Sequence, residues 1–531
     1  MFPFRRAAVR TPDDPGAGRR AAARVLAAGA ASAVLAVGSL AVATPAGAHG
    51  KDGAGSSTTS AKRQQFTDGV SVPVITSPNI RFVANVPDTA GISGVFAKSA
   101  PYFYVSSTDS ITVYDVSDPV RPRITGVLPN IVFENEAMNY GEKKVDGVTN
   151  RFVLVGVDLV EASPTAPDHI GRSNEVMLVD VTDPTAPRIR SRVPTTTNTH
   201  TVSCIHETDC QYAYTAGRNG TFSIVDLTDI DHPREVDADP ATDGVQPFSS
   251  PAAGPNAAFS SGAGHKWNFD DAGYGVHTGS GGSAIFDVSQ PTAPRLVATT
   301  DEHGVTGPWN DFIHHNSARP NAARFTAGQA PSVANGNVLL VTEEDYENTD
   351  CATAGSFQTW KIGGLDGTPG SVTPLDRINP VDAGEGVSAP HMAFCSAHWF
   401  DYHPAGIVAQ GYYEGGLRLL DVRDATDIKE YGYVASGLSE VWDAYWVPQR
   451  NKNGVAGTAR TNIVYTVDAV RGLDVYTVDL PGSAATTVPL LGAFGAGSDP
   501  AVTVLGLGLA ALTGLAALRR RRLGPGAARP A

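Results

Sequence analysis

Cysteine is scarce in this chain, which has four among 531 residues, and no two of them are spaced as CxxC. A structural zinc site built on cysteine pairs is therefore excluded. The sequence has no GxSxG motif, and its Gly-rich strings near Gly279 and Gly415 do not precede a helix. Neither a serine-hydrolase elbow nor a phosphate-binding loop is supported.

Positive charge is in deficit, with 40 Lys and Arg against 54 Asp and Glu, which gives a net charge of −14. Both ends of the chain are nevertheless basic: residues 1–48 carry +4 and residues 501–531 carry +5, which leaves −23 for the body between them. An acidic body argues against binding to nucleic acid and against adhesion to anionic lipid.

The N-terminal segment resembles a targeting signal. Six arginines accompany an apolar run from Val25 to Ala43, and Ala46-Gly47-Ala48 fits the small-x-small cleavage pattern. We expect a signal peptide over residues 1–48 with cleavage after Ala48. The pair Arg19-Arg20 leaves both the Sec and the twin-arginine export routes open, and an uncleaved N-terminal anchor is the alternative.

The C-terminal segment predicts a membrane anchor. Residues 501–518 are uncharged and are followed by four arginines, Arg519 to Arg522. Eighteen residues are just enough to span the hydrocarbon layer, and a basic cluster behind such a span stays cytoplasmic. We therefore predict a transmembrane helix over 501–518, a cytoplasmic basic tail over 519–531, and an exported body anchored at the cell surface of the plasma membrane.

An even number of cysteines in an exported protein suggests disulfides. Cys204 and Cys210 flank a short loop between two strand-like runs, so we expect them to pair. That leaves Cys351 to pair with Cys395.

One pattern recurs along the body: an apolar strand followed by Asp-Val-Ser-Asp-Pro-x-x-Pro. Its clear copies contain Asp115, Asp180, Asp226, Asp287 and Asp421, and weaker copies cover residues 358–364 and 473–482. A β-rich run precedes each copy and a short strand follows it. Seven repeats of four strands predict an all-β fold, a seven-bladed β-propeller over residues 79–480. Residues 49–78 are then a flexible Ser/Thr/Gly-rich lead, and 481–500 a linker.

The segment Asn79 to Asp88 looks like the outer strand of a repeat that has lost its own blade. We expect it to complete the seventh blade and close the ring, which removes exposed sheet edges.

These motifs resemble the LVIVD-repeat family of secreted and cell-surface propellers. The resemblance covers residues 79–480, and it implies location and architecture more than activity.

The starts of the innermost strands align four histidines in successive blades: His200, His265, His315 (or His314) and His398. Glu136 fills the equivalent place in the second blade, and Glu440 or Asp443 fills it in the seventh. Inner strands line the channel of a propeller, and imidazole suits Zn, Cu and Fe, so one interpretation is a metal site near the axis. Its supporting residues would be His277, His314, Glu343, Glu344 and Asp345. The alternative is that these histidines satisfy buried backbone groups.

Two functions follow. The first is a surface-anchored binding or interaction module for an unknown extracellular ligand or protein, without catalysis. The second is a metal-dependent enzyme, an oxidoreductase or a hydrolase, with Zn, Cu or Fe on the propeller axis. Propellers host both, so the fold does not choose between them.

The aromatic residues Trp399, Tyr402, Tyr412, Tyr413, Trp442 and Trp446 fit either a stacking platform for a ligand or packing between blades.

Overall fold

The computed structural model describes residues 57–87, 90–129, 136, 138–157, 174–217, 220–249, 264–305, 307–345, 351, 353–379 and 395–482. All of them belong to one compact unit, residues 47–531. The predicted signal peptide and the predicted transmembrane segment lie outside the described residues. Within the described ranges, no helix has the length and the apolar character that crossing a bilayer requires.

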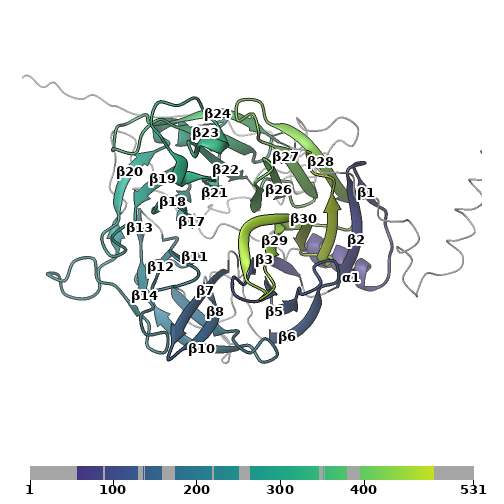
Figure 1. Ribbon diagram of the computed structural model, residues 1–531, viewed down its shortest axis with the longest axis horizontal. Helices are drawn as coiled ribbons and strands as arrows, with labels where there is room; N and C mark the ends of the chain where they lie inside the picture. Colours follow the sequence, from purple (N-terminus) through teal and green to yellow (C-terminus); the bar gives the residue numbers. More distant parts are fainter. Residues whose placement is uncertain are drawn as a thin grey trace, which may run out of the picture. The chain divides into compact units, whose positions relative to one another are not determined.

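The described strands form eight antiparallel sheets, seven of which are arranged as the blades of a ring (Figure 1). The first blade contains β3 (Gly91–Phe96), β4 (Tyr102–Ser107), β5 (Ser110–Asp115) and β6 (Arg123–Pro129). The second contains β7 (Asn139–Val145), β8 (Val148–Val157), β9 (Glu175–Asp180) and β10 (Arg188–Pro194). The third contains β11 (Val202–Cys204), β12 (Tyr212–Thr215), β14 (Ile224–Asp226) and β15 (Arg234–Glu235), with β13 (Thr221–Phe222) and β16 (Phe248–Ser249) paired beside it.

The remaining blades repeat this order. The fourth contains β17 (Gly264–Phe269), β18 (Tyr274–Gly279), β19 (Gly282–Asp287) and β20 (Arg295–Thr299). The fifth contains β21 (Ile313–Ala318), β22 (Val338–Glu344), β23 (Phe357–Ile362) and β24 (Val372–Ile378). The sixth contains β25 (Phe400–His403), β26 (Ile407–Gly411), β27 (Leu417–Asp421) and β28 (Lys429–Ser436), to which β1 (Val74–Thr76) adds a fifth strand. The predicted seven-bladed, all-β propeller is therefore confirmed.

The seventh blade closes the ring with a strand from the other end of the propeller. It contains β29 (Val441–Arg450), β30 (Ala456–Asp468) and β31 (Gly472–Val478), and β2 (Ile80–Val86) pairs with β31 from Ile80↔Val478 to Val86↔Leu473. The segment that the sequence assigned to this role thus occupies it. Closure leaves β31 with a partner on each side and joins the first described strands to the last.

The recurring motif forms the third strand of each blade and the turn behind it. In the third blade, Oδ1 of Asp226 accepts hydrogen bonds from the backbone N–H and the hydroxyl of Thr228, at 2.9 and 2.6 Å. Arg234, at the start of the next strand, pairs with the same carboxylate at 3.0 Å. Such turns are local, so a pattern of a few residues is enough to specify them.

The hydrophobic cores lie between neighbouring blades. One example joins the second and third blades through Phe152, Leu154, Val202 and Val225. Comparable clusters lie between each other pair of adjacent sheets, including the first and seventh. The apolar side chains of the strands thus pack between the blades.

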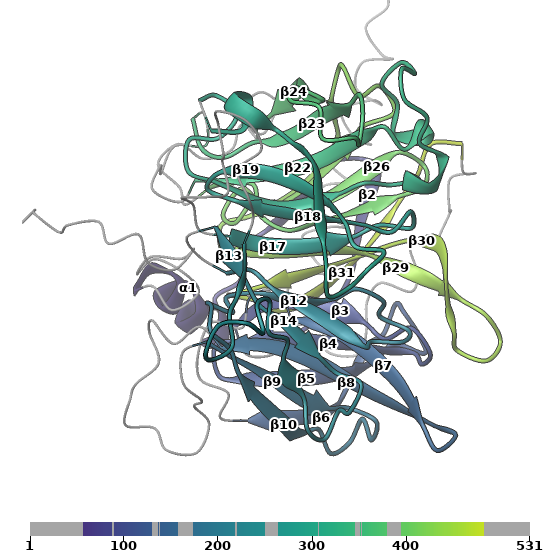
Figure 2. The same cartoon turned by 90° about the vertical axis from the view of Figure 1, so that its left-hand side faces the viewer.

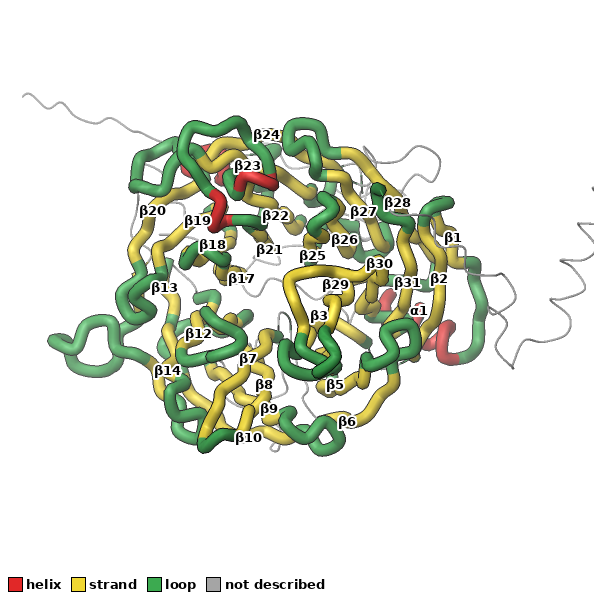
Figure 3. The backbone as a smooth tube through the Cα atoms, viewed as in Figure 1, coloured by secondary structure: helices red, strands yellow, loops and turns green. Residues whose placement is uncertain are grey.

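The segment predicted as a flexible lead contains helix α1 (Ser57–Thr67) as well as β1. Lys62 pairs with Glu414, and Nη1 of Arg63 donates to the carbonyl of Val470 at 3.2 Å. Figure 2 shows α1 on one face of the ring and the β29–β30 hairpin extending from the opposite face. Short 3₁₀ turns at Asp301–Val305, Ala322–Arg324 and Val333–Asn335 are the other helical segments of the described chain (Figure 3).

Candidate metal centre

The residues that the sequence aligned lie at or just before the first strand of each blade. His265 is in β17 and His315 in β21, whereas His200 and His398 precede β11 and β25 by two residues. Glu136 precedes β7 by three residues. The predicted equivalence of these positions in successive blades therefore holds in the structure.

Local backbone irregularities set the direction of two of these side chains. The pairing of β17 with β18 skips His265, and the pairing of β21 with β22 skips His315. Such β-bulges place one extra residue in a strand and re-aim its side chain. The residue before His265 is a glycine for steric reasons. A Cβ on Gly264 would lie 2.4 Å from Nε2 of His277, so a larger residue would clash with that ring.

The four imidazoles follow one another in blade order. Ring centroids are 4.9 Å apart for His200 and His265, 3.9 Å for His265 and His315, and 4.1 Å for His315 and His398. We call these four residues the histidine cluster. Although 198 residues of sequence separate its ends, the ring of blades brings its members into contact.

The carboxylate of Glu136 lies against all four rings. Its oxygens are 2.7 Å from Nε2 of both His200 and His315, 2.9 Å from Nε2 of His398, and 3.4 Å from Nε2 of His265. The indole N–H of Trp399 donates to the same carboxylate at 2.9 Å. Each of the four imidazoles therefore directs the same ring nitrogen toward one carboxylate.

Hydrogen bonds fix the tautomer of two rings. Nδ1 of His265 lies 2.9 Å from the carbonyl oxygen of His315, and Nδ1 of His398 lies 2.7 Å from that of Trp442. Because a carbonyl only accepts, both Nδ1 atoms carry hydrogen. In a neutral ring the lone pair is then on Nε2, which faces Glu136. Metal-binding histidines are usually held in place in this way, by a hydrogen bond from the ring nitrogen that does not bind the metal.

Burial favours the neutral form of two of these rings. The side chains of His265, His315 and His398 are fully buried. Burial holds the pKa of His315 well below its ordinary value of 6.5, and it also lowers the pKa of His398. A cation among these atoms would be bound by Nε2 lone pairs and by carboxylate oxygens together.

A second carboxylate approaches the cluster from the end of β22. Oε2 of Glu344 is 3.6 Å from Nε2 of His315, and Oε1 is 3.9 Å from Nε2 of His398. The hydroxyl of Tyr413 donates to Glu344. Two ligand groups have compatible geometry for an ion, Glu136–His265–His315 and His315–Glu344–His398. They share His315, so they describe one centre, since an imidazole Nε2 has one lone pair.

The structure gives Glu440 other partners. Its carboxylate accepts from the indole N–H of Trp442 at 2.8 Å and from the hydroxyl of Thr59 in α1 at 2.6 Å. Burial raises the pKa of Glu440 to about 7. We therefore leave Glu440, which the sequence placed among the ligands, out of the ligand set.

Most of the predicted supporting residues also have their own partners. Nε2 of His277 donates to the carbonyl of Ala216, and its ring stacks on Trp267. His314 contacts the hydroxyl of Ser283 and the carbonyl of Trp309. Burial lowers the pKa of His277 to about 3 and that of His314 to about 4. Neither ring is needed to explain the cluster, and of the predicted supporting residues Glu344 lies nearest to it.

Glu343 and Asp345 flank Glu344. The carboxylate of Glu343 accepts from the backbone N–H of Asp311 at 2.7 Å, and burial raises the pKa of Glu343 to about 7. The backbone N–H of Asp345 donates to the hydroxyl of Ser396, two residues before His398. The second contact holds the end of β22 against the segment that carries His398.

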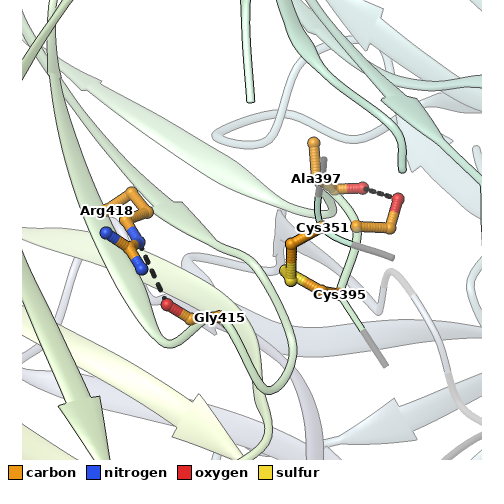
Figure 4. Close-up of a disulfide and its surroundings, with 6 residues drawn as sticks. Cys351, Cys395, Ala397, Gly415 and Arg418 are labelled. Carbon is orange, nitrogen blue, oxygen red and sulfur yellow. Dashed lines mark hydrogen bonds between the residues drawn. A yellow bond between two sulfur atoms is a disulfide. The ribbon is translucent and has the colours of Figure 1, made fainter. Parts of the chain in front are cut away.

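Both predicted disulfides are present, Cys204–Cys210 and Cys351–Cys395. The second is close in sequence to the centre: Cys395 precedes His398 by three residues, and Cys351 follows the end of β22 by seven. Figure 4 shows this disulfide beside Ala397 and Gly415, whose carbonyl accepts from Nε of Arg418 at 3.0 Å. A Cβ on Gly415 would lie 2.8 Å from the sulfur of Cys395, so a residue larger than glycine would fit here only if the disulfide shifted.

Two residues beside the cluster, Trp399 and Lys266, were not singled out by the sequence in these roles. Trp399 was one of six aromatic residues with two interpretations, and it is the one whose indole contacts Glu136. Four of the others, Tyr412, Tyr413, Trp442 and Trp446, are fully buried between blades, which supports the packing interpretation for them. Lys266 follows His265 directly, and its ammonium lies 5.1 Å from the centre of the Trp399 ring. The sequence offered one signal for Lys266, which is its position directly after the proposed ligand His265.

No family model and no curated protein matches the chain. Among solved structures, the chain is similar to the β-propeller domain of Cps50 (Swd1) from Myceliophteria thermophila, with 11% identity and a TM-score of 0.48 over 75% of this chain and all of that one. The class of protein rests on the sheet topology described above: this is a β-propeller.

Proposed function

We propose that the protein is a metal-dependent propeller enzyme whose centre holds one divalent transition-metal ion in the histidine cluster, with Glu136 as the carboxylate ligand. One observation carries the proposal: four imidazoles from four consecutive blades direct Nε2 at one carboxylate. Imidazole with one carboxylate suits Fe, Cu and Zn. Hydrogen bonds from Nδ1 of His265 and His398 support this assignment, because they leave Nε2 as the donor atom for a metal.

The identity of the ion decides the reaction class. Iron or copper supplies redox chemistry, whereas zinc supplies a Lewis acid that activates water. The protein's own contribution is the same in both cases. Its residues exclude water from three fully buried rings, fix the tautomers of His265 and His398, and place the indole N–H of Trp399 on Glu136.

Metal analysis of the chain purified without chelators tests the proposal. The unaltered protein is expected to hold about one transition-metal ion per chain, because the two candidate ligand groups share His315. His265→Ala and His398→Ala should remove most of it. His206→Ala is the matched control, since His206 is exposed in the small Cys204–Cys210 loop. A metal-free protein, or full metal content in both cluster variants, would overturn the proposal and leave a binding module.

The binding module is the second candidate, and the fold supports it, since β-propellers commonly serve as interaction modules. It needs no metal, and the acidic body would then present its surface to an extracellular partner. The metal content of the purified chain separates the two candidates.

We also propose that the protein is exported and anchored at the cell surface, as a member of the LVIVD-repeat family. Two disulfides support an oxidising compartment. N-terminal sequencing of the mature chain tests this: a start at His49 is expected, and a start at Met1 in a soluble cell fraction would contradict it.

A further inference from the structure

A cavity of about 250 Å³ lies among the inner strands, next to the histidine cluster. Trp399 forms part of the wall between the two, because its ring lines the cavity while its indole N–H donates to Glu136. The lining continues to Pro448 and Ala456 in the β29–β30 hairpin. That hairpin extends from the face opposite α1 (Figure 2). The cavity is smaller than the pockets of about 300–1,000 Å³ that hold drug-sized ligands, so it suits a small molecule.

Most charged groups around the cavity form pairs with each other. Lys98 pairs with Glu207 at 2.6 Å, and Nε of Arg460 is 3.5 Å from Asp401. Asp443 is fully buried, and burial raises its pKa well above 3.8, which favours the uncharged form of this carboxyl. The backbone N–H of Ala444 donates to Asp443 at 2.7 Å, and the hydroxyl of Tyr445 is also bound to it.

Lys266 brings a positive charge to the boundary between the cavity and the centre. The residue is 5% exposed, lines the cavity, and follows His265 at the bulge of β17. Burial lowers the pKa of Lys266 to about 8, and the charge of Glu136 opposes this shift, so the ammonium is the main form at neutral pH. A divalent ion in the cluster adds two positive charges against the carboxylate of Glu136. The region between the ion and Lys266 then favours an anion, since charges in a dry site are only weakly screened.

The rest of the lining has amide and aromatic side chains. Asn268 and Asn316 lie in the first strands of neighbouring blades and are joined by a hydrogen bond of 2.9 Å between their side chains. Amide N–H groups donate to carboxylate oxygens, and the rings of Phe96, Phe400 and Trp399 supply a flat apolar wall. An ammonium, two amides and aromatic walls match a carboxylate on an apolar body.

We propose that this cavity binds a small organic monocarboxylate, whose carboxylate contacts the ammonium of Lys266 beside the metal centre and whose body lies along Trp399. The inference rests on the proposed metal centre for its electrostatics and adds a ligand class to it. Lys266 is then a ligand-binding residue and not a metal ligand.

The test is calorimetric titration of the full chain with benzoate, acetate and inorganic phosphate, with the metal content measured on the same samples. Benzoate is expected to bind best. Lys266→Met should weaken benzoate about tenfold or more, as expected for a lost charge-assisted hydrogen bond. Lys266→Arg keeps the charge and should stay within about threefold of the unaltered protein, which guards against a variant that merely folds badly. All three proteins should hold the same amount of metal.

Lys361→Met is the matched control, because it removes one lysine charge from β23, the third strand of its blade. It should leave benzoate binding unchanged. Equal benzoate binding by Lys266→Met, or tighter binding of phosphate than of benzoate, overturns the inference. A chain without metal that still binds benzoate through Lys266 defeats the proposed function and leaves the inference standing. The reverse result, metal without benzoate binding, defeats the inference alone.

Discussion

Nε2 of His315 lies 2.7 Å from Oε1 of Glu136, although 179 residues of sequence separate the two. The second blade supplies the carboxylate and the fifth supplies the imidazole, so neither blade alone forms the contact. The same carboxylate reaches His200, His265 and His398. The centre is thus a property of the closed ring, in which residues from five blades meet.

The first prediction compares Glu136 with Glu440, both of which the sequence placed among the metal ligands. Glu136→Gln should lower metal affinity about tenfold or more, because the amide carries no charge and puts an N–H donor among the Nε2 atoms. Glu440→Gln should leave metal content unchanged, since the Glu440 carboxylate contacts Thr59 and Trp442. Metal titration followed by elemental analysis measures both. Equal losses in the two variants would return Glu440 to the ligand set.

The repeat motif made most of the fold predictable, because its turn is closed by local contacts such as that of Asp226 with Thr228. Counting copies then predicted the number of blades, and aligning the blades predicted that the histidines are neighbours. The bulges at His265 and His315 have no such local signal. They follow from the pairing with the second strand of the blade, which a single strand's sequence does not reveal.

Contacts between distant segments explain what the sequence did not predict. Helix α1 has a polar sequence, and it is held by long-range contacts such as that of Thr59 with Glu440, 381 residues away. The same contact occupies the Glu440 carboxylate. Neither the helix nor the partner of Glu440 could be read from composition, because each depends on the other.

The second prediction compares the two disulfides. Cys351–Cys395 closes 44 residues, whereas Cys204–Cys210 closes six. Loop-closure entropy predicts that removing the first pair by Cys→Ser changes costs about 4 kcal/mol of the free energy of unfolding, and removing the second about 2 kcal/mol. Denaturant unfolding of the two double variants measures this.

Metal content distinguishes the disulfides further. The Cys351–Cys395 variant should also hold less metal, because Cys395 is three residues from His398, and the other variant should hold the full amount. An equal effect of both pairs on metal content would show that the disulfide does not position His398.

The third prediction concerns ring closure. A chain that begins at residue 69 lacks α1 and should keep a folded propeller, whereas one that begins at residue 90 also lacks β1 and β2 and leaves the edge of β31 unpaired. Ile80 of β2 is 2% exposed in the core between the sixth and seventh blades. Burial of this side chain alone is worth about 1.5–3 kcal/mol, so the shorter chain should melt much lower or aggregate. Equal melting temperatures would contradict the closure.

The last prediction follows from the pKa of Glu440. The carboxyl is fully buried, and burial raises its pKa from 4.5 to about 7, against the hydrogen bonds from Thr59 and Trp442 and the charge of Lys62, which lower it. The charge of Asp468 adds to the increase. The folded state therefore holds this proton more tightly than the unfolded state. Its contribution to stability is fully present below pH 4.5 and is lost as the pH rises through about 7.

The variant Glu440→Gln has no proton to lose and keeps a side chain of the same shape. The free energy of unfolding of the variant, minus that of the unaltered protein, should therefore increase with pH by about 3 kcal/mol and level off above neutral pH. Denaturant unfolding of both proteins between pH 4 and pH 8 measures the difference, and pH effects at other sites cancel in it. Parallel profiles across this range would show that Glu440 is ionised in the folded protein, and α1 would then be held by a charged carboxylate.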